Sequence, residues 1–161
     1  MELGAAATLP LAFAKLGDAL ASIEPPAEDG LTRLEVEVAM QLEPALWLAH
    51  QRVFPRVYFS NQDKSLRVAG VGAAQRISSA AAFNDAEWTA MNRAISGASP
   101  RLRFYGGMRF DSEAEQRSEW AAFGGSFFVL PLWELQARCH LDPAWRMQPP
   151  ATPRHLFVAG V

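Results

Sequence analysis

The chain has 161 residues, of which 50% are hydrophobic and 20% are charged, and its formal net charge is −2. This length is about one domain's worth and can bury one sizeable core, and the composition excludes an intrinsically disordered chain. Lys15 and Lys64 are the only lysines, and the arginines are scattered. We therefore expect no nucleic-acid partner and no binding to an anionic membrane surface.

Cysteine content and hydropathy limit the cellular compartments in which the protein is expected. Cys139 is the only cysteine, which excludes an internal disulfide framework and favours a reducing compartment. No apolar run approaches the ~20 residues that span a bilayer, so no membrane partner is expected. The start, Met1-Glu-Leu3, lacks a basic region and is too acidic and arginine-poor for a transit peptide, so no clear targeting segment is expected.

The first predicted elements are a helix and a strand. Apolar residues at helical spacing predict a helix over residues 9–23, and the prolines within residues 24–30 end it. Residues 31–38 alternate apolar and charged positions, which predicts a strand with one solvated face. That face would carry Arg33, Glu35 and Glu37 as solvated charges.

The middle of the chain predicts two more helices around a hairpin. Residues 42–51 suggest a short helix whose inward side carries Leu42, Leu46 and Ala49, with Trp47 beside them. Residues 57–59 and 66–71 predict two strands of a hairpin, joined by the polar turn at 60–65. Residues 79–95 predict a helix capped by Ser78 or Ser79. Its expected buried stripe is Phe83, Trp88, Met91 and Ile95.

The last predicted elements are strands at residues 102–105 and 126–135, separated by a charged surface excursion at 111–120. Four prolines within residues 142–153 exclude a long helix or strand there. The predicted organisation is an amino-terminal helix and proline-rich linker (1–30), an α+β domain (31–140) and a proline-rich irregular tail (141–161). The fold class is α+β, a layered mixed or antiparallel sheet with helices packed on it.

No motif carries chemistry by itself. The segment Gly70-Val-Gly-Ala-Ala-Gln75 lacks the third glycine of a dinucleotide-binding loop and indicates a strand of small residues against which another backbone packs closely. The three histidines lack metal-ligand spacing, Cys139-His140 is not a zinc pattern, and the candidate serines lack a nucleophile-elbow context. These residues are His50, His140, His155, Ser60, Ser99 and Ser126. We therefore assign no catalytic, cofactor-binding or metal-binding residue.

Several segments in one order resemble isochorismate synthases, a family of chorismate-using enzymes, over roughly residues 8–140. The most specific are two stretches near the end of this region. One is Phe104-Tyr-Gly-Gly-Met-Arg-Phe-Asp111, and the other runs from Glu119-Trp120 through Phe123-Gly124 and Leu130-Pro131 to Glu134. The others are Gly30-Leu-Thr-Arg-Leu-Glu-Val36, Leu46-Trp-Leu-Ala-His-Gln51, Phe54-Pro-Arg-Val-Tyr-Phe-Ser60 and Val68-Ala-Gly-Val-Gly-Ala-Ala74.

The resemblance implies the fold of the amino-terminal half of these enzymes and the Mg²⁺-dependent conversion of chorismate to isochorismate. In the family a lysine activates water, a glutamate acts as general acid and further glutamates hold the metal, all in the carboxy-terminal half. Neither Lys15 nor Lys64 matches that lysine's motif. We expect this chain to be inactive by itself, to bind no Mg²⁺, and to need the missing chorismate-binding half in cis or in trans.

The family also implies a pathway, which is menaquinone, phylloquinone or salicylate precursor synthesis. The location would be the plastid in a photosynthetic eukaryote and the cytoplasm otherwise. Two alternatives remain open. One is a non-catalytic partner or regulatory module that associates with a separate chorismate-binding domain. The other is a sister enzyme, anthranilate or aminodeoxychorismate synthase component I, whose amino-terminal tryptophan-binding motif is not seen here.

Overall fold

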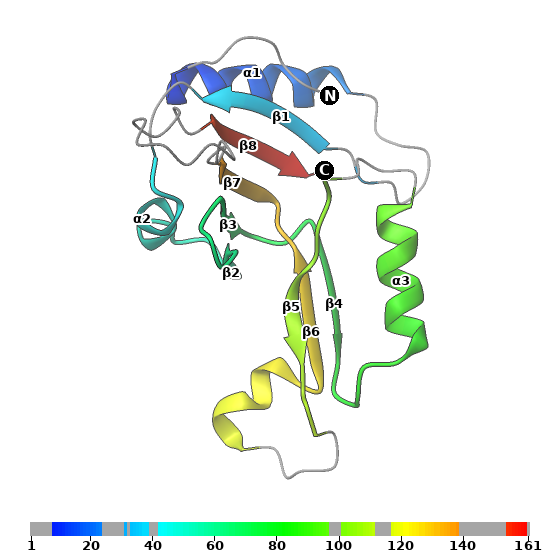
Figure 1. Ribbon diagram of the computed structural model, residues 1–161. Helices are drawn as coiled ribbons and strands as arrows, with labels where there is room; N and C mark the ends of the chain where they lie inside the picture. The colour runs from blue at the N-terminus through cyan, green and yellow to red at the C-terminus, as the bar shows by residue number, and fades with distance from the viewer. Residues whose placement is uncertain are drawn as a thin grey trace.

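The computed structural model describes residues 8–23, 31, 33–38, 42–96, 101–111, 117–138 and 154–160, the last of these as backbone alone. Two antiparallel sheets with helices around them form the fold (Figure 1). The predicted α+β class is therefore confirmed. Within the described residues, no helix has the length and apolar character needed to cross a membrane.

The larger sheet has five strands in the order β1-β8-β7-β3-β2, and every neighbouring pair is antiparallel. Their bounds are β1 Arg33–Val38, β8 Arg154–Gly160, β7 Trp133–Arg138, β3 Leu66–Val71 and β2 Arg56–Ser60. Helix α1, Leu9–Ser22, lies along β1 (Figure 1) and α2, Pro44–Ala49, packs near β2 and β3. The core between α1 and the sheet consists of Ala12, Leu16, Ala19, Leu34, Val36, Val38 and Leu135.

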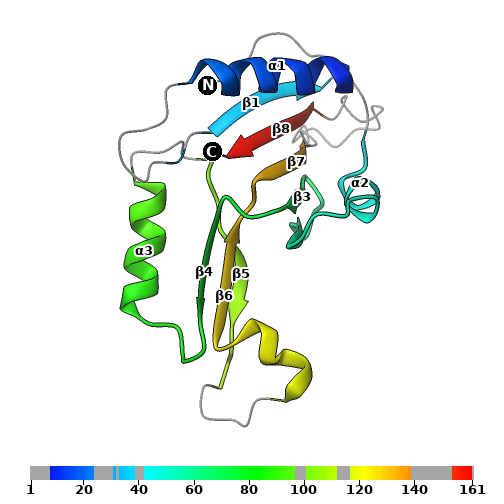
Figure 2. The same cartoon turned by 180° about the vertical axis from the view of Figure 1, so that it is seen from behind.

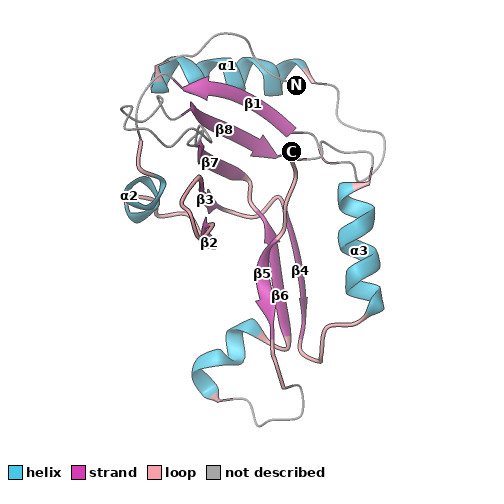
Figure 3. Ribbon diagram, viewed as in Figure 1, coloured by secondary structure: helices cyan, strands magenta, loops and turns pink. Residues whose placement is uncertain are grey.

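The smaller sheet has the order β4-β6-β5 and projects away from the larger one (Figure 3). Its strands are β4 Gln75–Ser79, β6 Ser126–Leu130 and β5 Tyr105–Met108, and the short helix η1, Ser118–Phe123, lies at its far end. Two residues, Pro131 and Leu132, separate β6 from β7, so one stretch of chain passes directly from the smaller sheet into the larger. The two sheets are therefore linked covalently by a connection of two residues.

Helix α3, Asp85–Ile95, stands beside β4 (Figure 2). It begins with a capping box, because the Asn84 side chain accepts hydrogen bonds from the Glu87 and Ala86 amides while the Glu87 carboxylate accepts one from the Asn84 amide. Glu87 is also buried and accepts a hydrogen bond from the Ser126 hydroxyl of β6. One acidic side chain therefore both caps the helix and joins it to the smaller sheet.

Several predictions are confirmed. The first helix ends at Ser22, one residue before the predicted end, and residues 56–71 form the predicted hairpin of β2 and β3. A close approach is present at Gly70, but it involves side chains rather than the predicted backbone, since a Cβ there would lie 2.6 Å from the Pro131 ring and 2.8 Å from the Val57 side chain.

Other predictions are wrong. The predicted helix at 79–95 begins only at Asp85, with Asn84 rather than a serine as its cap, and residues 75–79 form the unpredicted strand β4. Residues 126–135 form two strands in different sheets rather than one, and the strand expected at 102–105 is β5, which begins at Tyr105. Four residues that were expected inside are exposed: Leu46, Ala49, Trp88 and Ile95. A helical pattern shows which residues share a face but not whether another element covers that face.

The carboxy-terminal prediction is also wrong in part. Residues 154–160, expected to be irregular, form β8 and insert between β1 and β7. The reason is local, because the four prolines that exclude regular structure all precede Arg154. The remainder of the predicted tail, with the linker at 24–30, lies outside the described residues.

Candidate functional site

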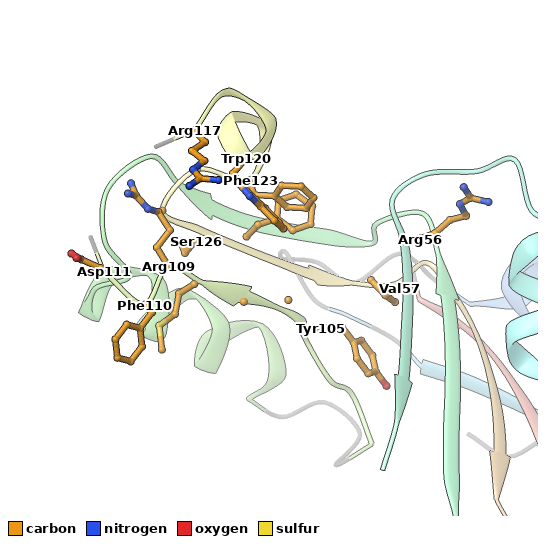
Figure 4. A pocket seen from close by; sticks show the side chains of 16 residues that line it. Arg56, Val57, Tyr105, Arg109, Phe110, Asp111, Arg117, Trp120, Phe123 and Ser126 are labelled. Carbon is orange, nitrogen blue, oxygen red and sulfur yellow. The ribbon is translucent and has the colours of Figure 1, made fainter. Parts of the chain in front are cut away.

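A groove of about 710 Å³ runs beside the smaller sheet (Figure 4). It lies between β5, the residues that follow β5, the helix η1 and the start of β6, and it reaches the edge strand β2 of the larger sheet. The residues that line it are Arg56, Val57, Tyr105, Gly106, Gly107, Met108, Arg109, Phe110, Asp111, Arg117, Trp120, Phe123, Gly124, Gly125, Ser126 and Phe127. Its volume falls within the range of ligand-binding clefts in proteins.

Five aromatic residues line the groove: Tyr105, Phe110, Trp120, Phe123 and Phe127. The Trp120 ring packs on Phe123 with centroids 5.7 Å apart, and Phe123 meets Phe127 edge-to-face at 5.7 Å. Both Trp120 and Phe123 are nevertheless half-exposed, and Phe110 is fully exposed. Aromatic pairs of this kind stabilise each other while leaving their outer faces available for a partner.

Glycines at the base of the groove have two different roles. Gly124, with φ of +63°, and Gly125 form a turn against the end of β4, and a Cβ on either would clash with the carbonyl oxygen of Ser79 or Ala81. These two positions therefore require glycine. Gly107 of β5 is different, because a Cβ there would meet no atom within 4 Å. The backbone at Gly107 is open to approach.

The charged side chains that line the groove, among the residues that the structure describes, are Arg56, Arg109, Arg117 and Asp111. The Arg56 guanidinium lies 4.4 Å from the centre of the Phe54 ring and donates a hydrogen bond to the Gln51 carbonyl, so the positive charges beside the groove come from Arg109 and Arg117. Arg109, Arg117 and Asp111 lie toward the end near η1, whereas Arg56 lies at the opposite end (Figure 4). The groove is thus an apolar surface with two guanidinium groups and one carboxylate near η1, which suits a partner that carries carboxylates beside apolar groups.

A buried network of charges lies within the larger sheet. Arg33 of β1 contacts the Glu35 carboxylate at 2.5 Å and Glu134 of β7 at 3.5 Å, and it donates a hydrogen bond of 2.6 Å to the Arg101 carbonyl. Arg101 contacts the other Glu35 oxygen at 2.5 Å, and buried Gln136 donates to Glu134. The prediction that Arg33 and Glu35 are solvated is therefore wrong, since residues 101–105 supply a partner for Glu35.

Tyr105 connects this network with the groove, because its side chain lines the groove and lies beside the Glu134 carboxylate. Burial, and next the negative charge of Glu134, raise the pKa of the Tyr105 phenol well above its usual value. The phenol therefore stays protonated at physiological pH. Such a group can position neighbours but does not act as a base.

The residues that the structure describes do not form a Mg²⁺ site. Mg²⁺ prefers carboxylate oxygens and water, yet the described part of the chain contains no group of three His, Cys, Asp or Glu side chains that could hold a metal. The buried carboxylates Glu35 and Glu134 are both within reach of arginine guanidinium groups. We assign no metal-dependent step to these residues.

The histidines, serines and cysteine considered as possible catalytic or metal-binding residues do not form a site in the part of the chain that the structure describes. The His50 ring contacts the Leu46 carbonyl on the surface, and the Ser60 hydroxyl donates to the Asn61 carbonyl. Ser126 donates to Glu87. His155 falls within β8, of which only the backbone is described, and Ser99, Cys139 and His140 lie outside the described residues. The groove was not anticipated as a site, and the one available signal was the cluster of glycines and aromatic residues in the segments that resemble the family.

The two-sheet architecture and the sequence together define the class. A family profile described as chorismate binding enzyme matches residues 19–142, so the chain belongs to the chorismate-binding enzyme family. The chain is 31% identical over 169 residues to the chloroplastic isochorismate synthase of Catharanthus roseus, covering 80% of this chain and 29% of that protein. It is also 31% identical over 133 residues to chloroplastic isochorismate synthase 2 of Arabidopsis thaliana, covering 70% of this chain and 24% of that protein.

A solved structure agrees on the fold. The menaquinone-specific isochorismate synthase MenF of Escherichia coli superimposes with a TM-score of 0.63 at 19% identity, covering 95% of this chain and 29% of MenF. The resemblance seen in the sequence is thus confirmed for the family and for the fold. The chain spans less than a third of the length of each of these relatives.

Proposed function

We propose that this chain is the non-catalytic scaffold portion of an isochorismate synthase, an enzyme that isomerises chorismate to isochorismate. The observation that carries the proposal is the match of 80% of this chain to 29% of an isochorismate synthase. In the proposed enzyme, the groups that perform chemistry belong to the portion that this chain does not span.

The chemistry explains why a second portion is needed. Isomerisation removes one hydroxyl and adds water elsewhere on the ring, so it requires a general acid for the leaving oxygen and a base for the water. A Mg²⁺ ion supplies a clamp for the substrate carboxylate when it is bound. The buried acids Glu35 and Glu134 lie beside arginines and suit none of these roles. We further propose that the product supports menaquinone, phylloquinone or salicylate synthesis, in a plastid as for the plant relatives.

An assay of the purified chain tests the inactive-scaffold proposal. Chorismate and Mg²⁺ are incubated with the chain, and isochorismate is measured by chromatography. We expect none above the background without protein, and formation above background would refute the proposal. As a positive control, the aligned part of the Catharanthus roseus enzyme is replaced by this chain, and this chimera should produce isochorismate.

A second candidate function is a module that associates in trans with a separately encoded chorismate-binding domain. The observation in its favour is the groove, whose exposed aromatic rings suit a protein contact. Sequencing the transcript beyond codon 161 distinguishes the two arrangements. A continuous reading frame encoding the rest of the family enzyme supports the scaffold in cis, whereas a stop codon supports association in trans.

A further inference from the structure

We propose that the groove is the docking surface for the chorismate-binding portion of isochorismate synthase, which inserts an apolar segment flanked by acidic side chains. This proposal rests on the proposed function and specifies which surface makes the contact and what chemistry it recognises. Four observations support it: the exposed rings, the open backbone of β5, the sign of the charge and the length of the relatives.

The first observation is that large apolar side chains are exposed together on one side of the molecule. Met108, Phe110, Trp120 and Phe123 all line the groove, and each is at least half-exposed. Soluble proteins seldom leave such clusters in water, and where they do, the cluster commonly marks an interface. Tryptophan in particular supplies much of the binding energy at protein interfaces. These four side chains are therefore the expected centre of the contact.

The second observation concerns the edge of the smaller sheet. Strand β5 is terminal in the order β4-β6-β5, so within the described sheet it pairs on one side with β6. An edge strand can accept a further segment of polypeptide. The open space at Gly107 allows such a segment to approach the β5 backbone closely.

The third observation is the charge, which decides between two occupants. Among the described lining residues, Arg109, Arg117 and Asp111 give the η1 end of the groove a net positive charge, which favours a segment with acidic side chains. A second copy of this chain that docked groove to groove would bring two surfaces of the same charge together, because a two-fold contact uses the same surface twice. A different polypeptide therefore suits the groove better than a second copy.

The fourth observation is the length of the relatives. More than two thirds of both plant isochorismate synthases has no counterpart in this chain. That remaining portion is the polypeptide that accompanies this chain's counterpart within each relative. It is therefore the occupant to which the proposal commits.

The test measures binding of this chain to the separately expressed remainder of the Catharanthus roseus enzyme, which is the portion outside the aligned region. We expect a one-to-one complex by calorimetry and sedimentation. Trp120→Ala should raise the dissociation constant at least tenfold. Trp88→Ala, on α3 and outside the groove, is the matched control because the two tryptophans are 60% and 56% exposed, and it should change the constant less than twofold.

A second pair of variants tests the open backbone without removing any side chain. Gly107→Leu adds bulk at the groove, and Gly17→Leu adds the same bulk on α1, where a Cβ likewise meets no atom within 4 Å. We expect Gly107→Leu alone to weaken the complex at least tenfold.

Arg117→Glu tests the charge of the groove, and it should slow association and reverse the salt dependence of the association rate. Circular dichroism of each variant shows that the chain itself remains folded.

The outcomes separate the docking surface from the enzyme function. Absence of a complex overturns the proposal, as does equal binding by the groove variants and their controls. Dimers of this chain that Trp120→Ala dissociates would identify a second copy as the occupant and would also overturn it. Isochorismate formed by the mixture is recorded separately. If the groove variants weaken the complex but the mixture forms no isochorismate, the docking surface is supported and the proposed function is contradicted. If the mixture forms isochorismate and the groove variants have no effect, the proposed function is supported and the docking surface is contradicted.

Discussion

Replacing Glu35 by glutamine removes a carboxylate that contacts two guanidinium groups inside the protein. Glu35 contacts both Arg33 and Arg101 at 2.5 Å, and its side chain is 4% exposed. After the change, the Arg33 guanidinium remains buried, with Glu134 at 3.5 Å as its acidic neighbour. The substitution therefore leaves a positive charge with a weaker partner in a region that excludes water.

The magnitude follows from how deeply each partner is buried. Removing one member of a buried ion pair costs roughly 3–5 kcal/mol, because the other charge loses its compensation. The contribution of Arg101 is smaller, since its side chain is 39% exposed and water solvates it, which limits that share to about 1 kcal/mol or less. Because Arg33 keeps its contact with Glu134, we expect Glu35→Gln to lower the free energy of unfolding by about 3 kcal/mol, the lower end of that range. Glu37→Gln, two residues along the same strand but only half-buried, should cost about 1 kcal/mol or less.

Urea unfolding followed by far-ultraviolet circular dichroism measures both values. With a denaturant slope of about 2 kcal/mol per molar, Glu35→Gln should lower the midpoint by about 1.5 M. Glu37→Gln should lower it by about 0.5 M or less, with the slope unchanged in both. Equal losses for the two variants, or a loss below about 1 kcal/mol for Glu35→Gln, would show that the buried network does not contribute as the geometry implies.

Two further predictions concern other parts of the chain. Tyr105, whose pKa is raised, stays protonated in the folded state after the unfolded chain has ionised, so stability should fall as pH rises above about 10, by at most ~1.4 kcal/mol per pH unit. Tyr105→Phe should abolish this fall in stability with pH. In the Tyr58→Phe variant Tyr105 is the sole tyrosine, so the phenolate absorbance of that variant should rise only above pH 10. Asn84→Ala removes the cap of α3 and should cost about 1 kcal/mol in urea unfolding, whereas Thr8→Ala at α1, whose side chain makes no capping bond, should cost less; equal costs would contradict the capping argument.

The predictions that succeeded depend on neighbours along the chain. The helix α1 was predictable because its apolar residues recur at helical spacing, and the β2–β3 hairpin because polar turn residues separate two apolar runs. The family resemblance is also a property of the sequence order. The periodicity and the turn signal are each complete within a short segment, whereas the family resemblance rests on several segments in one order.

The predictions that failed depend on contacts between distant segments. Glu35 reads as solvated within its own strand, and its partner Arg101 lies 66 residues away. Pro131 marks in the sequence where the apolar run at 126–135 divides, but nothing in the run shows that β6 and β7 pair with strands of different sheets. Trp88 lies on a helical stripe that would be buried only if another element covered it.

The sequence alone therefore determined helix α1, the β2–β3 hairpin, the α+β class and the family, because periodicity and turn residues act between near neighbours and the family motifs recur in one order. Only the tertiary structure decided which charges are buried and which side chains line the groove. The Arg33–Glu35–Arg101 network and the groove between β5, η1 and β2 each combine residues that are remote in sequence. Burial is set by what packs against a side chain, and no property of the side chain's own segment specifies that neighbour.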